Sequence, residues 1–242
     1  MSTTERRRPR IRLPEDQAAT LRSGSVVLPG SLAHYLGRVL RVRVGQEIEL
    51  FDGAGYLALG MVQRVERGGV VLRVAEGTRL PRRGLRLVVG VAPPKGPRAE
   101  WLVEKLTEVG VDTIVWLLTR RSVTTPEPQS NKVSRWLRLA DAAAAQCGRA
   151  DVPALVGPES LEAFMARDLG PHRFVADPSG GSLSGEAPLG RAALLVGPEG
   201  GFTPVELREA GERGYTPLSL GHTILRTETA ALVGSALLLS AG

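Results

Sequence analysis

Two glycine-containing segments hold the residue types best suited to binding a small ligand. The first, residues 196–202, reads VGPEGGF, and the second, residues 220–230, reads LGHTILRTETA. Glycine lets a ligand approach bare backbone, although a tight turn between a strand and a helix also needs glycine when no ligand is present. The two segments therefore indicate either a binding site or a pair of structural turns.

Several common kinds of active site are missing from the sequence. It contains no phosphate-binding loop ending in GKS or GKT, no GxGxxG after the first strand of its second part, and no GxSxG around a serine. His222 is a possible general base, but a single histidine beside glycine in a loop is more often an ordinary polar contact. With one cysteine, Cys147, and three histidines, we expect neither an internal disulfide nor a metal site.

The positive charge of the chain is concentrated near its beginning. The first 83 residues carry 15 arginines, no lysine and 8 acidic residues, a net charge of +7, whereas the remaining residues have a net charge of −1. A basic module beside a nearly neutral one indicates that the first part meets a polyanion such as RNA or DNA. A solvated arginine-rich surface is the alternative.

The first part of the chain has the pattern of a small β domain. Strands are expected over residues 48–51, 56–65 and 70–75. The turn pair Asp52-Gly53 follows the first of them, and residues 31–40 place apolar side chains at helical spacing. Residues 79–84 have the composition of a linker. We expect a small β-barrel with one helix across it over residues 1–80.

Strands alternate with helices from residue 84 to residue 242, which predicts an α/β domain with a mainly parallel sheet. The predicted strands are 85–92, 113–118, 173–176, 192–196 and 215–220, and the predicted helices are 98–109, 132–146, one opened by Thr203 and closed by Gly214, and 229–239. Thr203 and Glu206 have the spacing of a capping box, with Pro204 at the first helical position. Both glycine segments follow predicted strands, where open α/β sheets bind ligands.

Composition points to a globular protein with no membrane-spanning segment. Hydrophobic residues make up 43% and charged residues 23% of the chain. No apolar run reaches the ~18 residues that span a bilayer, and the first residues are polar and arginine-rich. We expect a cytoplasmic protein.

The residues around the glycine segments resemble a known family. The run 194–231, with GPEGGF followed by LGxxILRTETA, resembles the signature of the RsmE family, which are 16S ribosomal RNA uridine-N3 methyltransferases of the SPOUT superfamily. Further matching segments are PKG at 94–96, EW at 100–101, Lys105, EVGV at 108–111, QCGR at 146–149, HYL at 34–36, VLR at 39–41 and LFDG at 50–53. One departure is Ala145, where the family pattern usually has glutamate.

The resemblance implies the architecture and the partners. The expected fold is α/β, with a PUA-like β-barrel that binds RNA over residues 1–80 and a SPOUT methyltransferase domain over residues 84–242 that contains a deep trefoil knot. The implied cofactor is S-adenosylmethionine (SAM), without a metal. The implied partners are 16S ribosomal RNA or the small ribosomal subunit, and a second copy of the chain. The apolar final helix suits such an interface or a plain core element.

The resemblance also implies the site residues. The cofactor is expected to contact Leu195, Gly197, Glu199, Gly200, Leu220, Gly221, Leu225, Thr227 and Ala230. Arg226 and Glu228 are implied as catalytic residues: Arg226 would hold the uracil oxygens and favour the N3 anion, and Glu228 would act as a base or orient the arginine. The alternative is an Arg–Glu pair that fixes the loop. Together with the charge distribution, the resemblance predicts RNA contacts at Arg10, Arg12, Arg38, Arg41, Arg43, Lys95 and Arg149.

Two other functions remain compatible with the residues. One is a SPOUT methyltransferase that acts on another ribosomal RNA base or on transfer RNA. The other is a noncatalytic ribosome-assembly factor that binds RNA through the basic first domain. The presence of both glycine segments favours an enzyme over the assembly factor.

Overall fold

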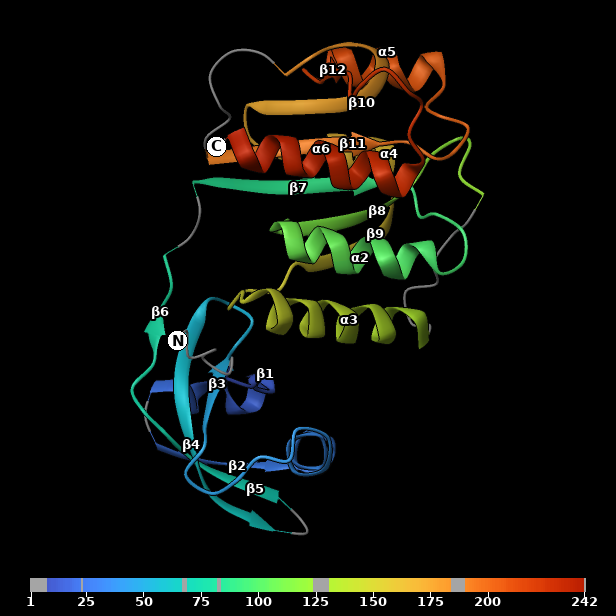
Figure 1. Cartoon of the computed structure of the whole chain (residues 1–242). Helices are drawn as coiled ribbons and strands as arrows, with labels where there is room; N and C mark the ends of the chain where they lie inside the picture. The colour runs from blue at the N-terminus through green and yellow to red at the C-terminus, as the bar shows by residue number, and fades with distance from the viewer. Residues whose placement is uncertain are drawn as a thin grey trace, which may run out of the picture. The chain divides into compact units, whose positions relative to one another are not determined.

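The computed structural model of the chain forms two compact units (Figure 1). It describes residues 8–22, 24–66, 69–81, 84–123, 131–183 and 190–241. The first unit comprises Met1–Arg82 and Ala144–Val152, and the second comprises Arg83–Ala143 and Pro153–Gly242. Each unit is described by itself.

The first unit is built around a six-stranded sheet in the order β1-β3-β4-β5-β2, with β6 paired to β4. Its strands are β1 (Arg10–Arg12), β2 (Gly24–Pro29), β3 (Glu47–Phe51), β4 (Tyr56–Glu66), β5 (Gly69–Val74) and β6 (Thr78–Arg79). Strand β1 is parallel to β3, and the other pairs are antiparallel. A 3-10 helix η1 (Glu15–Arg22), a short helix α1 (Gly30–His34) and a π-helical turn η2 (Tyr35–Val39) complete the unit.

The hairpin between β3 and β4 shows how the local sequence forms this sheet. Ile48 and Leu50 alternate with half-buried glutamates in β3, so that one face of the strand enters the core. At the turn, one oxygen of Asp52 accepts hydrogen bonds from the amides of Ala54 at 2.7 Å and Tyr56 at 3.0 Å. Gly53 has a φ of 81°, which favours glycine. The predicted hairpin is confirmed.

A segment from the later part of the chain belongs to the first unit. Helix α3 (Asn131–Cys147) begins in the second unit, and its last residues pass into the segment Ala144–Val152. Ala144 and Ala150 pack against the fully buried Phe51. The amide of Val152 donates to the Gly53 carbonyl at 2.9 Å, and the amide of Gly55 donates to the Ala150 carbonyl at 3.1 Å. The sequence patterns did not predict this arrangement.

The second unit contains a six-stranded parallel sheet in the order β12-β10-β11-β7-β8-β9. Its strands are β7 (Leu85–Val91), β8 (Thr113–Leu118), β9 (Ala154–Ser160), β10 (His172–Gly181), β11 (Gly190–Val196) and β12 (Thr216–Leu218). The remaining helices are α2 (Arg98–Val109), α4 (Leu161–Met165), α5 (Pro204–Glu212) and α6 (Thr227–Ala241). The prediction of an α/β domain with a parallel sheet is confirmed.

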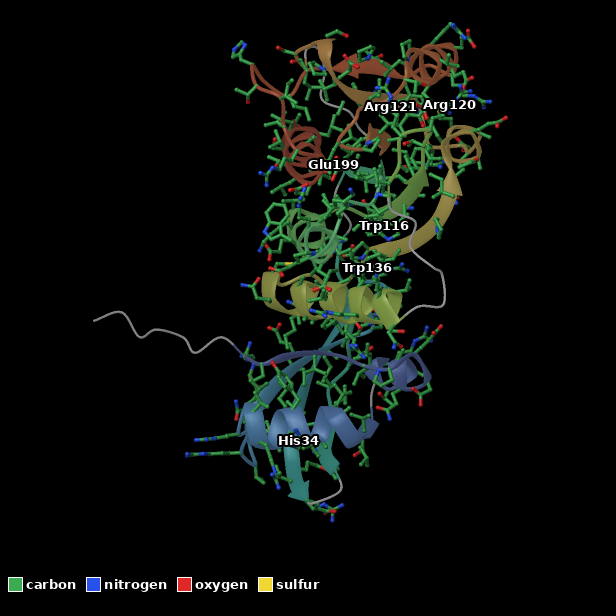
Figure 2. The ribbon with its side chains drawn as sticks, turned by 90° about the vertical axis from the view of Figure 1, so that its right-hand side faces the viewer. His34, Trp116, Arg120, Arg121, Trp136 and Glu199 are labelled. Atoms are coloured by element: carbon green, nitrogen blue, oxygen red, sulfur yellow. The ribbon has the colours of Figure 1, made fainter. Side chains whose placement is uncertain are left out.

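Helices cover both faces of this sheet. Helices α4 and α5 pack on one face, where Phe164 and Ala210 join a cluster with Leu117 and Leu195. Helices α2 and α6 pack against each other, and α6 also contacts β7 and β11 (Figure 1). Trp116 of β8 stacks against Trp136 of α3, with 4.8 Å between the ring centroids (Figure 2). Buried on both faces, the central strands are the nearly continuous apolar runs seen in the sequence.

Several local signals in the second unit act as the sequence predicted. Helix α2 ends at Gly110, whose φ of 107° is left-handed. Helix α5 begins with a complete capping box, in which the Thr203 hydroxyl accepts from the amide of Glu206 and the Glu206 carboxylate accepts from the amide of Thr203.

Candidate functional site

A pocket lies where the ends of β10 and β11 meet the two glycine segments. It has an open volume of about 810 Å³, counting the solvent at its mouth. The lining residues are Ala176, Asp177, Pro178, Val196, Gly197, Pro198, Glu199, Gly201, Phe202, Leu220, Gly221, Thr223, Ile224, Leu225, Thr227 and Ala230. The pocket is therefore formed mainly by residues from the two glycine segments.

Most residues expected to contact a cofactor line this pocket. They are Gly197, Glu199, Leu220, Gly221, Leu225, Thr227 and Ala230. Leu195 is not in the lining, because it is fully buried in β11 among core residues. Gly200 is also outside it, and its carbonyl accepts a hydrogen bond from Arg121 Nη1 at 2.7 Å.

Backbone conformation shapes the pocket at two glycines. Gly221 has a φ of 130° and Gly201 a φ of 68°, both in the region that favours glycine. No atom lies within 4 Å of the place where a Cβ would stand at Gly221. The Thr227 hydroxyl donates to the Gly197 carbonyl at 3.0 Å and so joins the first glycine segment to the start of α6.

The sequence patterns missed one side of the pocket. Asp177 lies in β10, next to Ala176 and Pro178, and lines the pocket with Glu199. One of its oxygens accepts hydrogen bonds from the amide and the hydroxyl of Ser179, at 2.8 and 2.6 Å. Asp177 follows directly after the predicted strand 173–176, and its position at a carboxyl end was the available signal.

Arg226 and Glu228 differ in their surroundings. Arg226 is exposed, and its side chain makes no hydrogen bond or ion pair with any residue that the structure describes. Glu228 is 7% exposed, does not line the pocket, and lies with Oε1 4.0 Å from Arg98 Nε. Glu228 faces Arg98 and not Arg226. The Arg226–Glu228 pair considered from the sequence is therefore not formed.

Two consecutive arginines in the loop after β8, Arg120 and Arg121, support the first glycine segment (Figure 2). Besides the bond from Arg121 to Gly200, the backbone amide of Arg120 donates to Glu206 Oε1 at 2.8 Å. Glu206 is 4% exposed. Burial raises its pKa, but the hydrogen bonds from Arg120 and Thr203 outweigh burial, so that the pKa lies below its ordinary value. Glu206 therefore stays ionised and holds the two loops together.

We expect Glu206→Gln to destabilise the fold by about 1–3 kcal/mol at neutral pH, because an amide group would then face a backbone donor. Because the native pKa of Glu206 is lowered, its carboxylate makes its full contribution to the free energy of unfolding above pH ~4.5. This contribution is lost as the pH falls through the native pKa. The gap in unfolding midpoint between wild type and variant should therefore narrow in acid. Urea unfolding from about pH 7 to about pH 3 measures it.

The matched control for this prediction is Glu212→Gln on the same helix. The Glu212 side chain is 67% exposed and pairs with Arg208 at 3.9 Å, so its substitution should change the midpoint little. A Glu206→Gln gap that keeps its size in acid would contradict the role given to the carboxylate.

The residues predicted to contact RNA fall into two groups. Arg38, Arg41, Arg43 and Lys95 are exposed. Arg10 pairs with Glu49 at 3.3 Å and Arg149 pairs with Asp151 at 2.7 Å, and both side chains are at least 89% buried. Arg12 is half-buried, with its guanidinium packed over Gly53. Net charge in the sequence does not distinguish exposed arginines from those already paired with carboxylates.

Among the residues that the structure describes, no group of three or more histidine, cysteine, aspartate and glutamate side chains is arranged to hold a metal ion. No helix in the same part of the chain is long and apolar enough to cross a membrane.

Comparison with known proteins identifies the family of the chain. Residues 81–239 match the model of an RNA methyltransferase domain, and residues 28–75 match an RNA methyltransferase PUA domain. The chain is 32% identical over 222 residues to the ribosomal RNA small subunit methyltransferase E of Synechocystis. The aligned region covers 88% of this chain and 72% of the relative.

Two solved structures extend the comparison over nearly the whole fold. A methyltransferase from Legionella pneumophila in complex with SAM has a TM-score of 0.87 and 30% identity, and covers 98% of each chain. Ribosomal RNA small subunit methyltransferase E from Neisseria gonorrhoeae bound to SAM has a TM-score of 0.86 and 26% identity, and covers 96% of this chain and 97% of that one. The predicted α/β class and PUA-like first domain are thereby confirmed, and the chain belongs to the family of ribosomal RNA small subunit methyltransferase E, the RsmE family.

Proposed function

We propose that this protein transfers a methyl group from SAM to N3 of a uridine in the decoding region of 16S ribosomal RNA. The observation that carries the proposal is the pocket enclosed by the two glycine segments, within the region that matches the RNA methyltransferase family. The relatives from Legionella pneumophila and Neisseria gonorrhoeae were solved with SAM bound. Uridine N3 as the target follows from the resemblance to the RsmE family.

The residues of the pocket fit SAM. This cofactor supplies an activated methyl group on a positively charged sulfonium and also carries an ammonium group. The carboxylates of Asp177 and Glu199 suit a ligand with positive charge, and Leu220, Leu225 and Ala230 provide apolar wall. The bare backbone at Gly197 and Gly221 offers amides and carbonyls for orientation. We therefore assign the cofactor site to this pocket, without Leu195 and Gly200 in its wall.

Arg226 is the proposed catalytic residue. Uridine N3 carries a proton at neutral pH, so that methylation requires loss of the proton and stabilisation of the resulting anion. Arg226 follows the pocket-lining Leu225, is exposed, and has a guanidinium not engaged by any described residue. Its planar fork can hold uracil oxygens and favour the N3 anion. Glu228, buried against Arg98, is assigned a supporting role instead of direct contact with the base.

The first domain is the proposed RNA-binding module, with Arg38, Arg41 and Arg43 as phosphate contacts. All three are exposed, and Arg41 has a φ of 51°, an uncommon angle for a residue other than glycine. Lys95 is the corresponding candidate in the methyltransferase domain. Arg10 and Arg149 are already paired with carboxylates, which leaves the proposed surface to the exposed residues.

Combined substitution of Arg38 by alanine and Arg41 by asparagine, which tolerates the left-handed region, is expected to weaken RNA binding and leave SAM binding unchanged. Each lost phosphate contact should lower the slope of log affinity against log salt by about 0.7 to 0.9. Fluorescence anisotropy with a 16S ribosomal RNA fragment across a salt series measures both quantities.

The control is the double variant Arg8→Ala and Arg64→Ala, which removes the same charge from arginines paired with Glu47 and Glu66. It should affect binding less, because each arginine is already engaged with a carboxylate. The same affinity and salt slope in the wild type and the Arg38/Arg41 variant would exclude this surface.

The oligomeric state and the knot also belong to the proposal. We propose a homodimer formed through α2 and α6, which pack against each other and leave Trp101 41% and Leu237 40% exposed. Light scattering should give twice the 25.8 kDa mass of the chain. The deep trefoil knot within residues 84–242 and a cytoplasmic location remain predictions from the resemblance and the composition.

Two measurements test the function and separate it from the alternatives. Calorimetry with SAM should show saturable binding, whereas a noncatalytic assembly factor should show none. Mapping of modified uridines in small-subunit RNA, with and without this protein, should then find one uridine that gains a methyl group at N3. Methylation of another base or of transfer RNA would favour the other SPOUT activity.

A further inference from the structure

Arg98 lies between two carboxylates beside the pocket. Its Nη1 is 3.7 Å from Glu199 Oε1 and its Nε is 4.0 Å from Glu228 Oε1. Both distances exceed a hydrogen bond and are those of ion-pair contacts. Glu199 lines the pocket, whereas Glu228 is buried outside the lining. Arg98 thus connects an acid in the pocket wall with a buried acid from another element.

The position of Arg98 in its helix points to a role other than helix stability. Arg98 is the first residue of α2, where the helix dipole disfavours a cation, and Pro97 before it provides no side-chain cap. Glu228 lies in the first turn of α6, where the dipole favours an anion. The arginine is therefore unfavourable for its own helix, and the two carboxylates offset this.

Glu228 depends on Arg98 for its charge balance. Its Oε2 is buried and has no hydrogen-bond partner among the residues that the structure describes. Arg98 is the cation that the structure places against its Oε1. Without Arg98, a buried carboxylate would lose this partner and would repel the neighbouring Glu199. The repulsion would act on the carboxylate that lines the pocket.

We propose that Arg98 is a positioning residue for cofactor binding: it neutralises Glu228 and thereby holds the Glu199 carboxylate at the pocket wall. The inference rests on the proposed function, because SAM is the cationic ligand whose affinity Glu199 sets. The sequence analysis did not single out Arg98, since its partners lie about 100 and 130 positions away in the chain.

The test combines SAM calorimetry with a double-mutant cycle between Arg98 and Glu228. Arg98→Ala should weaken SAM binding about two- to fivefold, the range for losing one partly exposed ion pair. Adding Glu228→Gln to that variant should restore part of the affinity, because the unpaired buried charge is then gone. Arg98→Lys should fall between wild type and Arg98→Ala, because lysine keeps the charge and lacks the fork. Loss of α2 packing alone would not be rescued at Glu228.

Thermal unfolding without SAM provides a readout that does not depend on the cofactor. It compares the four proteins of the cycle, which are the wild type, Arg98→Ala, Glu228→Gln and the double variant. The two substitutions should be non-additive there as well. The matched control is Arg135→Ala. Arg135 of α3 pairs with Glu100 of α2 at 2.7 Å, so this variant also removes an ion pair of α2, and it should leave SAM affinity unchanged. If Arg98→Ala fails to fold, Arg98→Lys and Glu228→Gln provide the same comparison.

The outcomes separate the inference from the function on which it rests. Wild-type affinity in Arg98→Ala, no rescue by Glu228→Gln, or additive effects on unfolding would overturn the role of Arg98. A wild-type protein that binds no SAM would instead contradict the proposed function, and the unfolding cycle would still measure the Arg98–Glu228 pairing.

Discussion

Arg226→Ala is expected to lower the rate of methyl transfer by about 100- to 1000-fold, the typical cost of removing one well-placed donor to a transition state. The physical reason is that the guanidinium stabilises charge that develops on the uracil only as the N3 proton is lost. Arg226→Lys keeps the charge without the planar fork and should lie between wild type and alanine. Single-turnover methyl transfer to small-subunit RNA at saturating SAM is the measurement.

Two further readouts separate a chemical role of Arg226 from a structural one. SAM affinity should change far less than the rate, because the interaction forms mainly with the reacting base. Raising the pH should recover part of the rate of the alanine variant by supplying more deprotonated uridine. A loss of rate that is fully explained by weaker SAM binding would make Arg226 a structural residue of its loop.

Gly221→Ala should weaken SAM binding by about 5- to 150-fold, which corresponds to a backbone strain of about 1–3 kcal/mol. Gly221 has a φ of 130° and lines the pocket, and an alanine there would relax toward other backbone angles. The loop must then be forced back into shape for binding, and this cost appears in the affinity. Calorimetry on the folded variant gives the value directly.

Gly214→Ala is the control for the effect of strain alone. Gly214 has a φ of 81° at the end of α5, has open space where a Cβ would stand, and lies outside the pocket lining. Its substitution should reduce thermal stability and leave SAM affinity unchanged. Equal SAM affinity in Gly221→Ala and wild type would remove Gly221 from the cofactor site.

Local patterns were sufficient for the elements that are buried and regular. Helix α2 spans the predicted residues 98–109, because its apolar spacing and the stop at Gly110 lie within the segment itself. Strand β9 was missed because it lies at the edge of the sheet, where its side chains are mostly half-buried or exposed and give no continuous apolar run. Strand β1 has only three residues, two of them arginine.

The site was predictable where it consists of consecutive residues. The two glycine segments could be located from their composition and from the strands before them. Asp177 was missed although it directly follows the predicted strand 173–176. Arg98 could not be located, because its place beside the site depends on contacts of α2 with α6 and with the first glycine segment. Charge counting likewise treated Arg10 and Arg38 as equals, although Arg10 is paired with Glu49 and Arg38 is exposed.

The sharing of Ala144–Val152 with the first unit has a consequence for synthesis of the chain. Phe51 and Gly55 contact residues of this segment. The segment is synthesised about 90 residues later than Phe51 and Gly55. During that interval Phe51 is without Ala144 and Ala150, whereas the main core of the first unit, from Ile11 to Val74, uses only residues that are already synthesised. The N-terminal unit therefore completes its packing around Phe51 only after about 60 residues of the second unit have been translated, and a fragment ending at Arg82 would leave this apolar side open.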